Sequence, residues 1–156
     1  MLNLDRFDIG ILDALQADAR ATNVEIAEKV SLSPSPCLRR IRNLEKSGVI
    51  RGYRADLDRR KVGLGLTVFV DIKVGHHNRE NSEALQAALT GLPEVAAAFL
   101  ISGTADFMAE VVVEDLSAYE RFLTQKLLVL PGVIDIRSNF AIRIVKTGTP
   151  LKLPQP

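Results

Sequence analysis

The sequence predicts an α+β protein built from two parts, a bundle of three helices followed by a domain in which strands and helices alternate. Residues 4–48 place apolar side chains at helical spacing and contain two clear helix-start signals. Residues 66–145 contain β-branched runs separated by two helical segments. Between these parts, residues 58–65 combine a run of charged residues with two glycines, a composition typical of a hinge.

The first helix is predicted from about Asp5 to Ala17. Its apolar side chains recur every three or four residues and form one face: Leu4, Phe7, Ile11 and Leu15. Asp5 is a suitable N-cap, and the acidic first turn favours the positive end of the helix dipole. Together with the two helices that follow, this helix matches the core of helix-turn-helix domains.

Two short helices joined by a tight turn are predicted next. Thr22 and Glu25 have the spacing of a capping box, which predicts a helix start. Ser33 followed by Pro34 predicts a second start, with a hydroxyl cap and then a proline where no N–H is needed. Gly48 is expected to end the second helix in the left-handed conformation.

On a helical wheel, the second helix of this pair has an apolar stripe and a polar face. The stripe, which should face the core, consists of Cys37, Ile41 and Leu44, with Leu38 beside it. The polar face carries Ser35, Arg39, Arg42, Asn43 and Lys46, with Arg40 at its boundary. Arginine can bind guanine and asparagine can bind adenine through paired hydrogen bonds, so this face suits a DNA major groove. The alternative is an ordinary helical hairpin with a solvated basic face.

Charge supports the DNA-binding interpretation. Residues 39–61 contain nine Lys or Arg and three Asp or Glu, a net charge of +6 in a chain whose total is +1. A local excess of this kind is the electrostatic footprint of a nucleic-acid binder. We predict base contacts by Ser35, Arg39 and Asn43, and phosphate contacts by Arg40, Arg42, Lys46, Arg51 and Arg54, with Ser33 also in the DNA-binding set.

The alternating segment 53–57 predicts a strand. Arg51 and Arg54 lie just before it and within it, so this strand would contact phosphates as the wing of the DNA-binding domain. An isolated strand needs a partner, and no hairpin mate lies close in the sequence. We therefore expect it to pair with its counterpart in a second subunit.

The second part is predicted as a ferredoxin-like βαββαβ domain. Strands are expected at 66–74, 95–101, 107–113 and 133–145, and helices at 83–92 and 116–130. Ser117 and Glu120 have capping-box spacing at the start of the second helix. The chain is thus divided into a winged helix-turn-helix domain (1–57), a hinge (58–65), a ferredoxin-like domain (66–147) and an extended tail (148–156).

Membrane and secreted proteins are not expected. No run of about 18 apolar residues is present, so no membrane span is predicted. The segment MLNLDRFD lacks the basic and apolar regions of a signal peptide. The single cysteine, Cys37, excludes an internal disulfide and fits a reducing compartment. We therefore expect a cytoplasmic protein.

No catalytic, cofactor or metal site is predicted. His76 and His77 would point to opposite sides of an extended chain and have no further good ligands nearby. The segment Gly63-Leu64-Gly65 lacks the third glycine and the following helix of a nucleotide loop. None of the common nucleophile, zinc or phosphate-loop signatures occurs, so an enzyme is the weaker hypothesis.

Five segments, taken in order, resemble the Lrp/AsnC family, the feast/famine transcriptional regulators of bacteria and archaea. They are LDRFDIGILDALQADAR, LSPSPCLRRIRNLEKSGVIRGYRADLD, GLGLTVFVDIKV, SGTADFMAEVVVED and LPGVIDIRSNFAI, and the resemblance spans residues 2–150. It implies a sequence-specific regulator that binds double-stranded DNA through a winged helix-turn-helix domain joined to a ligand-sensing ferredoxin-like domain. It also implies an amino acid as the small-molecule effector, and homodimers that assemble further, to octamers.

The resemblance places the effector pocket at the loop 102–106 and the facing strand, a set that comprises Ser102, Gly103, Thr104, Ala105, Asp106 and Ser138. Gly103 would let backbone N–H groups approach a carboxylate, and Asp106 would pair with an α-ammonium. The alternative is a simple hairpin turn stabilised by Asp106. Two residues depart from the family's pattern: Ala105 stands where an aromatic residue is common, and Glu110 where a basic one is common.

Two other functions are compatible with the sequence. A stand-alone amino-acid-binding or amino-acid-metabolising protein could be built on the second domain, but it would have no need of the segment with net charge +6. An architectural protein that binds DNA broadly without an effector would keep that segment. Such a protein would show a low ratio of specific to non-specific affinity.

Overall fold

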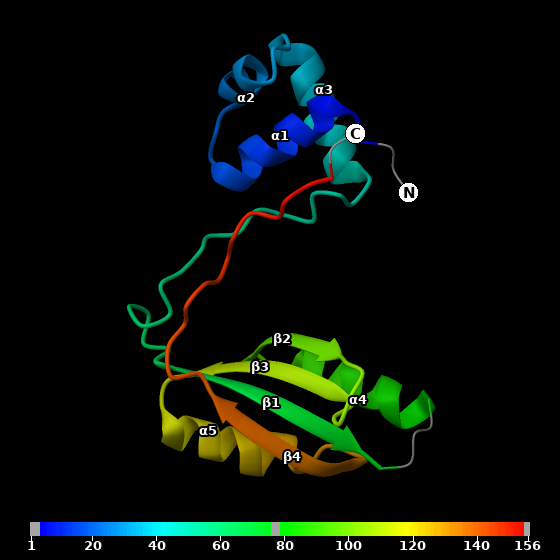
Figure 1. The fold of residues 1–156 in the computed structure, drawn as a ribbon, viewed down its shortest axis with the longest axis vertical. Coiled ribbons are helices and arrows are strands. Elements are labelled where there is room, and N and C mark those ends of the chain that lie inside the picture. Colours follow the sequence, from blue (N-terminus) through cyan, green and yellow to red (C-terminus); the bar gives the residue numbers. More distant parts are fainter. Residues whose placement is uncertain (1–3, 76–78, 155–156) are drawn as a thin grey trace. The chain divides into compact units, whose positions relative to one another are not determined.

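The computed structural model describes residues 4–75 and 79–154, and the chain folds as two compact units (Figure 1). One unit consists of Met1–Asp56 together with Lys146–Pro156, and the other of Leu57–Val145. The tail that we expected as a separate segment therefore belongs with the three helices. Among the described helices, none is long and apolar enough to cross a bilayer.

Three helices form the N-terminal unit, as predicted: α1 (Arg6–Ala17), α2 (Asn23–Lys29) and α3 (Pro34–Lys46). The Asp5 carboxylate caps α1, and Thr22 and Glu25 form a complete capping box at the start of α2. Gly48 has a φ of 76° and follows the last turn of α3, so it ends that helix as expected.

The predicted hydroxyl cap at the start of α3 is wrong. Ser33 has the extended backbone of an N-cap residue, but its side chain makes no capping hydrogen bond. An N-cap side chain binds the N–H of the second or third helical residue. The third residue here is Pro36, which has no N–H, so one of the two possible donors is missing.

The core of this unit lies where the three helices meet. The buried side chains are Ile11, Leu12, Ala14, Ile26, Ala27, Cys37, Ile41 and Leu44. Leu4 and Leu15, predicted on the inner face of α1, pack at the edge of this cluster. Leu38, which we also expected to face the core, is 37% exposed. It lies one residue beyond Cys37, and a rotation of about 100° per residue carries it away from the contact with α1 and α2.

No strand forms at the predicted wing within the described single chain, and its pairing with a second subunit stays a prediction. Residues 51–58 are exposed and belong to no strand. A strand needs a ladder of backbone hydrogen bonds to a neighbour, and the described segments of this single chain supply none at this point. The Tyr53 hydroxyl does hold the segment to α3 by donating to Glu45 Oε1 at 2.9 Å.

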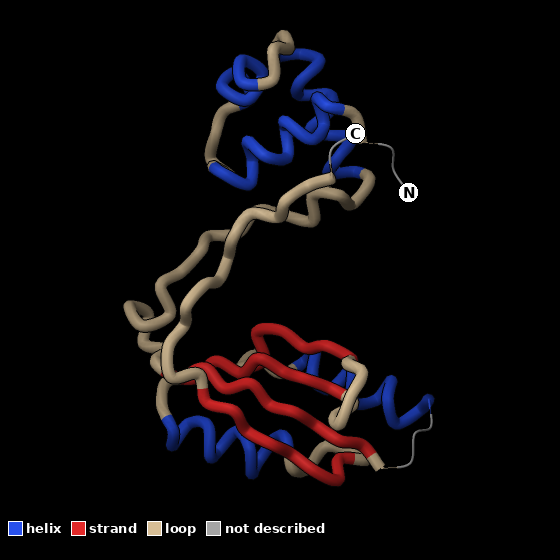
Figure 2. Tube along the Cα trace, in the orientation of Figure 1, coloured by secondary structure: helices blue, strands red, loops and turns tan. Residues whose placement is uncertain are grey.

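The second unit follows the predicted βαββαβ order (Figure 2). Its elements are β1 (Leu66–Val74), α4 (Arg79–Gly91), β2 (Val95–Leu100), β3 (Phe107–Val113), α5 (Leu116–Phe122) and β4 (Val133–Phe140). The strands form one antiparallel sheet in the order β2-β3-β1-β4. The ferredoxin-like prediction is confirmed.

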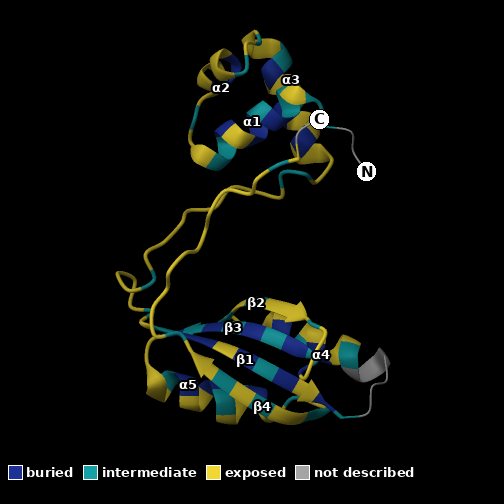
Figure 3. Ribbon diagram, viewed as in Figure 1, coloured by how far each residue is buried: buried dark blue, intermediate teal, exposed yellow. Residues whose placement is uncertain are grey.

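Both helices of this unit cover the same face of the sheet. Alternate strand residues point to this face and are buried, among them Val68, Val70 and Ile72 of β1 and Phe107 and Ala109 of β3 (Figure 3). The helices contribute Leu85, Leu89, Tyr119 and Phe122 to the same cluster. The residues between the buried strand positions, such as Phe69, Asp71 and Lys73, lie on the opposite face.

Several boundaries differ from the predictions. Helix α4 begins at Arg79, four residues earlier than expected. The cap of α5 is Asp115, which accepts from the Ala118 N–H at 2.8 Å, so the predicted capping box from Ser117 to Glu120 is wrong. After Phe122 the helix continues as a π-helical turn, η1 (Leu123–Leu127). The predicted strand 133–145 ends at Phe140 as β4. The Ala141 N–H still donates to the Thr67 carbonyl at 3.0 Å, but residues 142–145 form no further ladder with β1.

Candidate DNA-reading helix and ligand site

Helix α3 presents a polar face to solvent. Its apolar stripe is fully engaged in the core, with Cys37 at 0% and Leu44 at 3% exposure, so the opposite face cannot turn inward. The predicted DNA-binding residues that are exposed are Ser33, Ser35, Arg39, Arg42, Asn43 and Lys46, followed by Arg51 and Arg54 beyond the helix. A helix held from behind that presents Arg and Asn in front has the arrangement needed to enter a groove.

Arg40 is the exception within the predicted set. Its guanidinium donates to Asp8 at 2.8 Å and pairs with Asp5 at 2.9 Å, and it lies 5.3 Å from the centre of the Phe7 ring. The hydrogen bond to Asp8, supported by Asp5, raises the pKa of Arg40. Arg40 therefore ties α3 to the start of α1. The acidic first turn of α1 was the signal for this pair, but a sequence does not say which cation it meets.

Two capping carboxylates of the N-terminal unit have lowered pKa values. The backbone N–H of Asp8 chiefly lowers the pKa of Asp5, and that of Thr22 chiefly lowers the pKa of Glu25. A carboxyl group whose pKa is lower in the folded state than in the unfolded state stabilises the fold when the pH is above its ordinary pKa of about 4. This stabilisation is lost as the pH falls through the folded-state pKa.

We therefore expect the melting temperature of the chain to fall on acidification below about pH 4. The double variant Asp5→Asn, Glu25→Gln should show a shallower fall, because its caps no longer titrate. Melting curves recorded by circular dichroism across this range measure the difference. Parallel curves for the two proteins would contradict the assignment.

The loop 102–106 joins β2 to β3 and is held by the neighbouring strand. The Asp106 carboxylate accepts from the Val74 N–H at 2.8 Å, and the Asp106 N–H donates to the Ile72 carbonyl at 3.1 Å. Gly103 has a φ of 137°, a conformation that a residue with a Cβ rarely adopts. The loop is therefore a hydrogen-bonded hairpin turn, and Asp106 is one of the groups that fix its shape.

This loop borders a hollow of about 350 Å³. The lining residues are Asp71, Lys73, Gly103, Thr104, Ala105, Asp106, Asp135 and Arg137. Four of these residues were not predicted from the sequence: Asp71 and Lys73 of β1, and Asp135 and Arg137 of β4. Their signal was their place as polar residues in strands of alternating pattern. The strand register pairs Asp71 with Arg137 and Lys73 with Asp135. Cations and carboxylates thus face the loop together.

Ser138 does not share this hollow. Its hydroxyl is hydrogen-bonded to the Tyr119 hydroxyl of α5, on the helix-covered face of the sheet. Within this chain the strand alternation therefore directs Ser138 away from the loop with which it was predicted to form the effector pocket. Ser102 is exposed and is not among the residues that line the hollow.

Glu110, which the resemblance marked as a departure from the expected pattern, has a partner from the predicted hinge. Arg59 Nη1 lies 2.6 Å from Glu110 Oε1 and 3.2 Å from Thr67 Oγ1. The side chains of Arg59 and Glu110 are 26% and 22% exposed. The departure at Glu110 therefore serves an ion pair that fastens the hinge segment onto the sheet.

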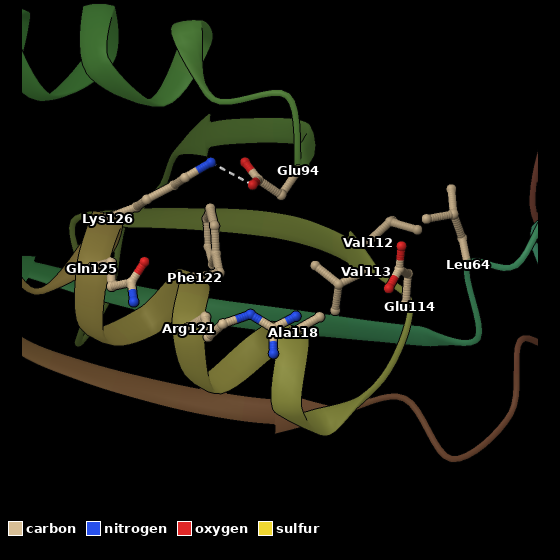
Figure 4. Close-up of a pocket in the computed structure, with 10 residues that line it drawn as sticks. All are labelled: Leu64, Glu94, Val112, Val113, Glu114, Ala118, Arg121, Phe122, Gln125 and Lys126. Carbon is tan, nitrogen blue, oxygen red and sulfur yellow. Dashed lines mark hydrogen bonds and ion pairs between the residues drawn. The ribbon is translucent and has the colours of Figure 1, made fainter.

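A second hollow, of about 310 Å³, lies between α5 and the turn before β2 (Figure 4). Lys126, from the π-helical turn, forms an ion pair with Glu94 across one end of it. Burial disfavours the charge on Glu94, but the hydrogen bond and charge of Lys126 together with a backbone hydrogen bond outweigh it, so the pKa of that carboxyl is lowered. None of the predicted ligand-binding residues lines this hollow, which is therefore separate from the loop site.

Among the described residues, no three His, Cys, Asp or Glu side chains form a cluster that could hold a metal ion. His76 and His77 lie outside the described residues. Cys37 is buried, and burial raises the pKa of its thiol, which fits the predicted core filler.

Models of known protein families match both parts of the chain. Residues 4–51 match the winged helix-turn-helix DNA-binding family, and residues 67–151 match the Lrp/AsnC ligand-binding domain. The chain is 39% identical over 152 residues to the leucine-responsive regulatory protein of Rhizobium meliloti (strain 1021), which covers 97% of each chain. It is 40% identical over 149 residues to the protein of the same name from Escherichia coli (strain K12), covering 96% of this chain and 91% of that one.

Solved structures of transcriptional regulators also resemble this chain over nearly its whole length. A transcriptional regulator of Neisseria meningitidis in complex with L-methionine superposes with a TM-score of 0.89 at 38% identity, over 96% of this chain and 97% of that one. An AsnC family transcriptional regulator of Agrobacterium tumefaciens superposes with a TM-score of 0.88 at 36% identity, over 97% of each chain.

Proposed function

Because the chain belongs to the Lrp/AsnC family of transcriptional regulators, with a DNA-binding and a ligand-binding domain, we propose that α3 reads operator DNA and that an amino acid bound at the loop 102–106 controls assembly. The DNA-reading part of the proposal rests on one observation: the polar face of α3 is exposed, and the apolar stripe on the opposite side of the helix is buried. In this proposal Arg39, Asn43 and Ser35 contact bases, and Arg42, Lys46, Arg51 and Arg54 contact phosphates. Arg40 is omitted because it is paired within the domain.

The chemistry of the loop hollow supports an amino acid as the effector. A zwitterion needs an anionic group for its ammonium and donors for its carboxylate. Asp106 and Asp71 supply the first, and Arg137 and the backbone around Gly103 supply the second. The similar regulator of Neisseria meningitidis was solved with L-methionine, an amino acid.

The face of the sheet that the helices leave uncovered supports the proposal that the chain forms homodimers that assemble further, to octamers. Phe69 of β1 and Phe99 of β2 lie on this face, 38% and 51% exposed. Exposed aromatic side chains gathered on one face are typical of a protein interface. A ligand that binds one assembly better than another shifts the population toward it, and so changes which DNA half-sites are spanned together. We expect this regulator to act in the cytoplasm and to catalyse no reaction.

Binding of L-methionine and other amino acids to the full chain, followed by calorimetry and light scattering, tests the effector half of the proposal. Asp106→Asn should weaken binding of the best ligand about ten- to hundredfold, because it removes the charge that faces the ammonium while keeping an oxygen for the Val74 N–H. Ligand should also change the scattering mass of the wild type.

Glu120→Gln is the matched control, since Glu120 is an exposed carboxylate on α5 that does not line the loop hollow. It should bind as the wild type does. Equal affinities for Asp106→Asn and Glu120→Gln would remove the loop from the ligand site. Indifference of the wild type to every amino acid would end the effector proposal.

A further inference from the structure

The last residues of the chain return to the DNA-binding unit. Lys146–Pro156 belong to the same compact unit as Met1–Asp56, although the whole ligand-binding domain separates them in sequence. The described part of this tail contains no helix or strand (Figure 2). Its attachment therefore depends on individual contacts with the helices.

A side chain of α1 binds the tail backbone in both directions. Gln16 Nε2 donates to the Leu151 carbonyl at 3.1 Å, and the Leu151 N–H donates to Gln16 Oε1 at 2.6 Å. The amide thus bonds both backbone polar groups of one residue, as a neighbouring strand would. Such a two-point contact fixes the position of Leu151 along α1.

The apolar anchor of the tail is Leu153. It packs against the core cluster of the three helices, whereas the side chain of Leu151 is 73% exposed. Leu153 therefore covers core surface that would otherwise face water. The two leucines offer a natural comparison, because one contributes its side chain to the core and the other contributes its backbone.

The tail also passes close to the segment that leaves the unit. Gly148 has a φ of 63°, and a Cβ at this position would lie 3.1 Å from Asp56 Oδ2. The chain leaves the N-terminal unit after Asp56 and re-enters it at Lys146. Two covalent passages therefore connect this unit to the rest of the protein.

We propose that the C-terminal tail is a structural part of the DNA-binding unit, docked on α1 through Gln16 and Leu153. The contact reaches the recognition helix through α1, because Asp5 and Asp8 at the start of α1 hold Arg40 of α3. An undocked tail leaves α1 less well packed and loosens its hold on α3. In this arrangement the C-terminal tail stabilises α1, and α1 in turn holds α3 in place.

Hydrogen exchange on the full-length protein tests the proposal. In Leu153→Asp and in Gln16→Ala, amides of α1 and α3 should exchange about tenfold faster than in the wild type. The docked tail stabilises the closed state of the unit, so losing it raises the population of the open state from which amides exchange. Amides of α4 in the other unit should keep their rates, which shows that the protein remains folded.

Leu151→Ala is the matched control and should exchange within about twofold of the wild type, since it removes an exposed side chain and keeps the bonded backbone. Leu153→Met should keep the slow exchange of the wild type, because methionine has a similar volume and preserves the apolar contact. If Leu153→Asp exchanges like Leu151→Ala, the tail merely rests on the surface and the proposal fails. This readout contains no DNA, so its failure is distinct from a failure of the proposed operator contacts.

Discussion

Arg39→Ala is expected to weaken operator binding by about 1–3 kcal/mol and to relax sequence preference at one base pair. Arg39 is exposed on the face of α3 opposite the buried stripe, without a partner among the ion pairs of the described chain. A guanidinium presented in this way can form two hydrogen bonds to guanine. Competition binding with an operator selected from random duplexes measures both the affinity and the preference.

Lys46→Ala separates base reading from phosphate contact. It should weaken binding to all sequences alike and lower the slope of log affinity against log salt by about one. Arg121→Ala, an exposed arginine on α5, serves as the control and should change neither quantity. If Arg39→Ala and Lys46→Ala both behave like Arg121→Ala, α3 is not the reading helix.

Ile11→Ala is expected to destabilise the DNA-binding unit by about 2–5 kcal/mol, and Ile72→Ala to do the same to the ligand-binding unit. Both side chains are completely buried, in different core clusters. Native-state hydrogen exchange resolves the two units in one sample. Amides of α1–α3 should lose protection in Ile11→Ala, and those of the sheet in Ile72→Ala.

Ile142→Ala is the matched control for this pair, because Ile142 is 96% exposed and its truncation should change stability by no more than about 0.5 kcal/mol. Loss of protection in both units from either core substitution would mean that the chain unfolds as one cooperative body. It would contradict the two separate cores.

The elements whose signals are local were predictable. The caps at Asp5 and Thr22 and the helix end at Gly48 depend on contacts within four residues, and all three are as expected. The strands 66–74 and 107–113 were predicted from β-branched residues and match the structure at both ends. The exposed residues of α3 followed from the helical period once the apolar stripe was identified.

The differences from the predictions lie where a partner decides the outcome. The alternation at 53–57 predicted a strand paired with a second subunit; the described single chain contains no such neighbour, and the segment forms no strand within it. Arg40 had the same chemistry as Arg39 in the sequence, and the proximity of Asp5 and Asp8 separated their roles. Ser138 was assigned to the ligand loop, and the register of β4 against β1 placed it beneath α5.

The sequence by itself determined the two-part α+β architecture, the order of the elements and the basic face of α3, because periodicity, caps and charge are properties of neighbouring residues. The tertiary structure alone decided which charged groups meet: Arg40 with α1, Arg59 with Glu110, and the strand pairs that face the loop 102–106. It also decided that the tail returns to α1. Such contacts join residues far apart along the chain, and their energies depend on distances that only the folded packing sets.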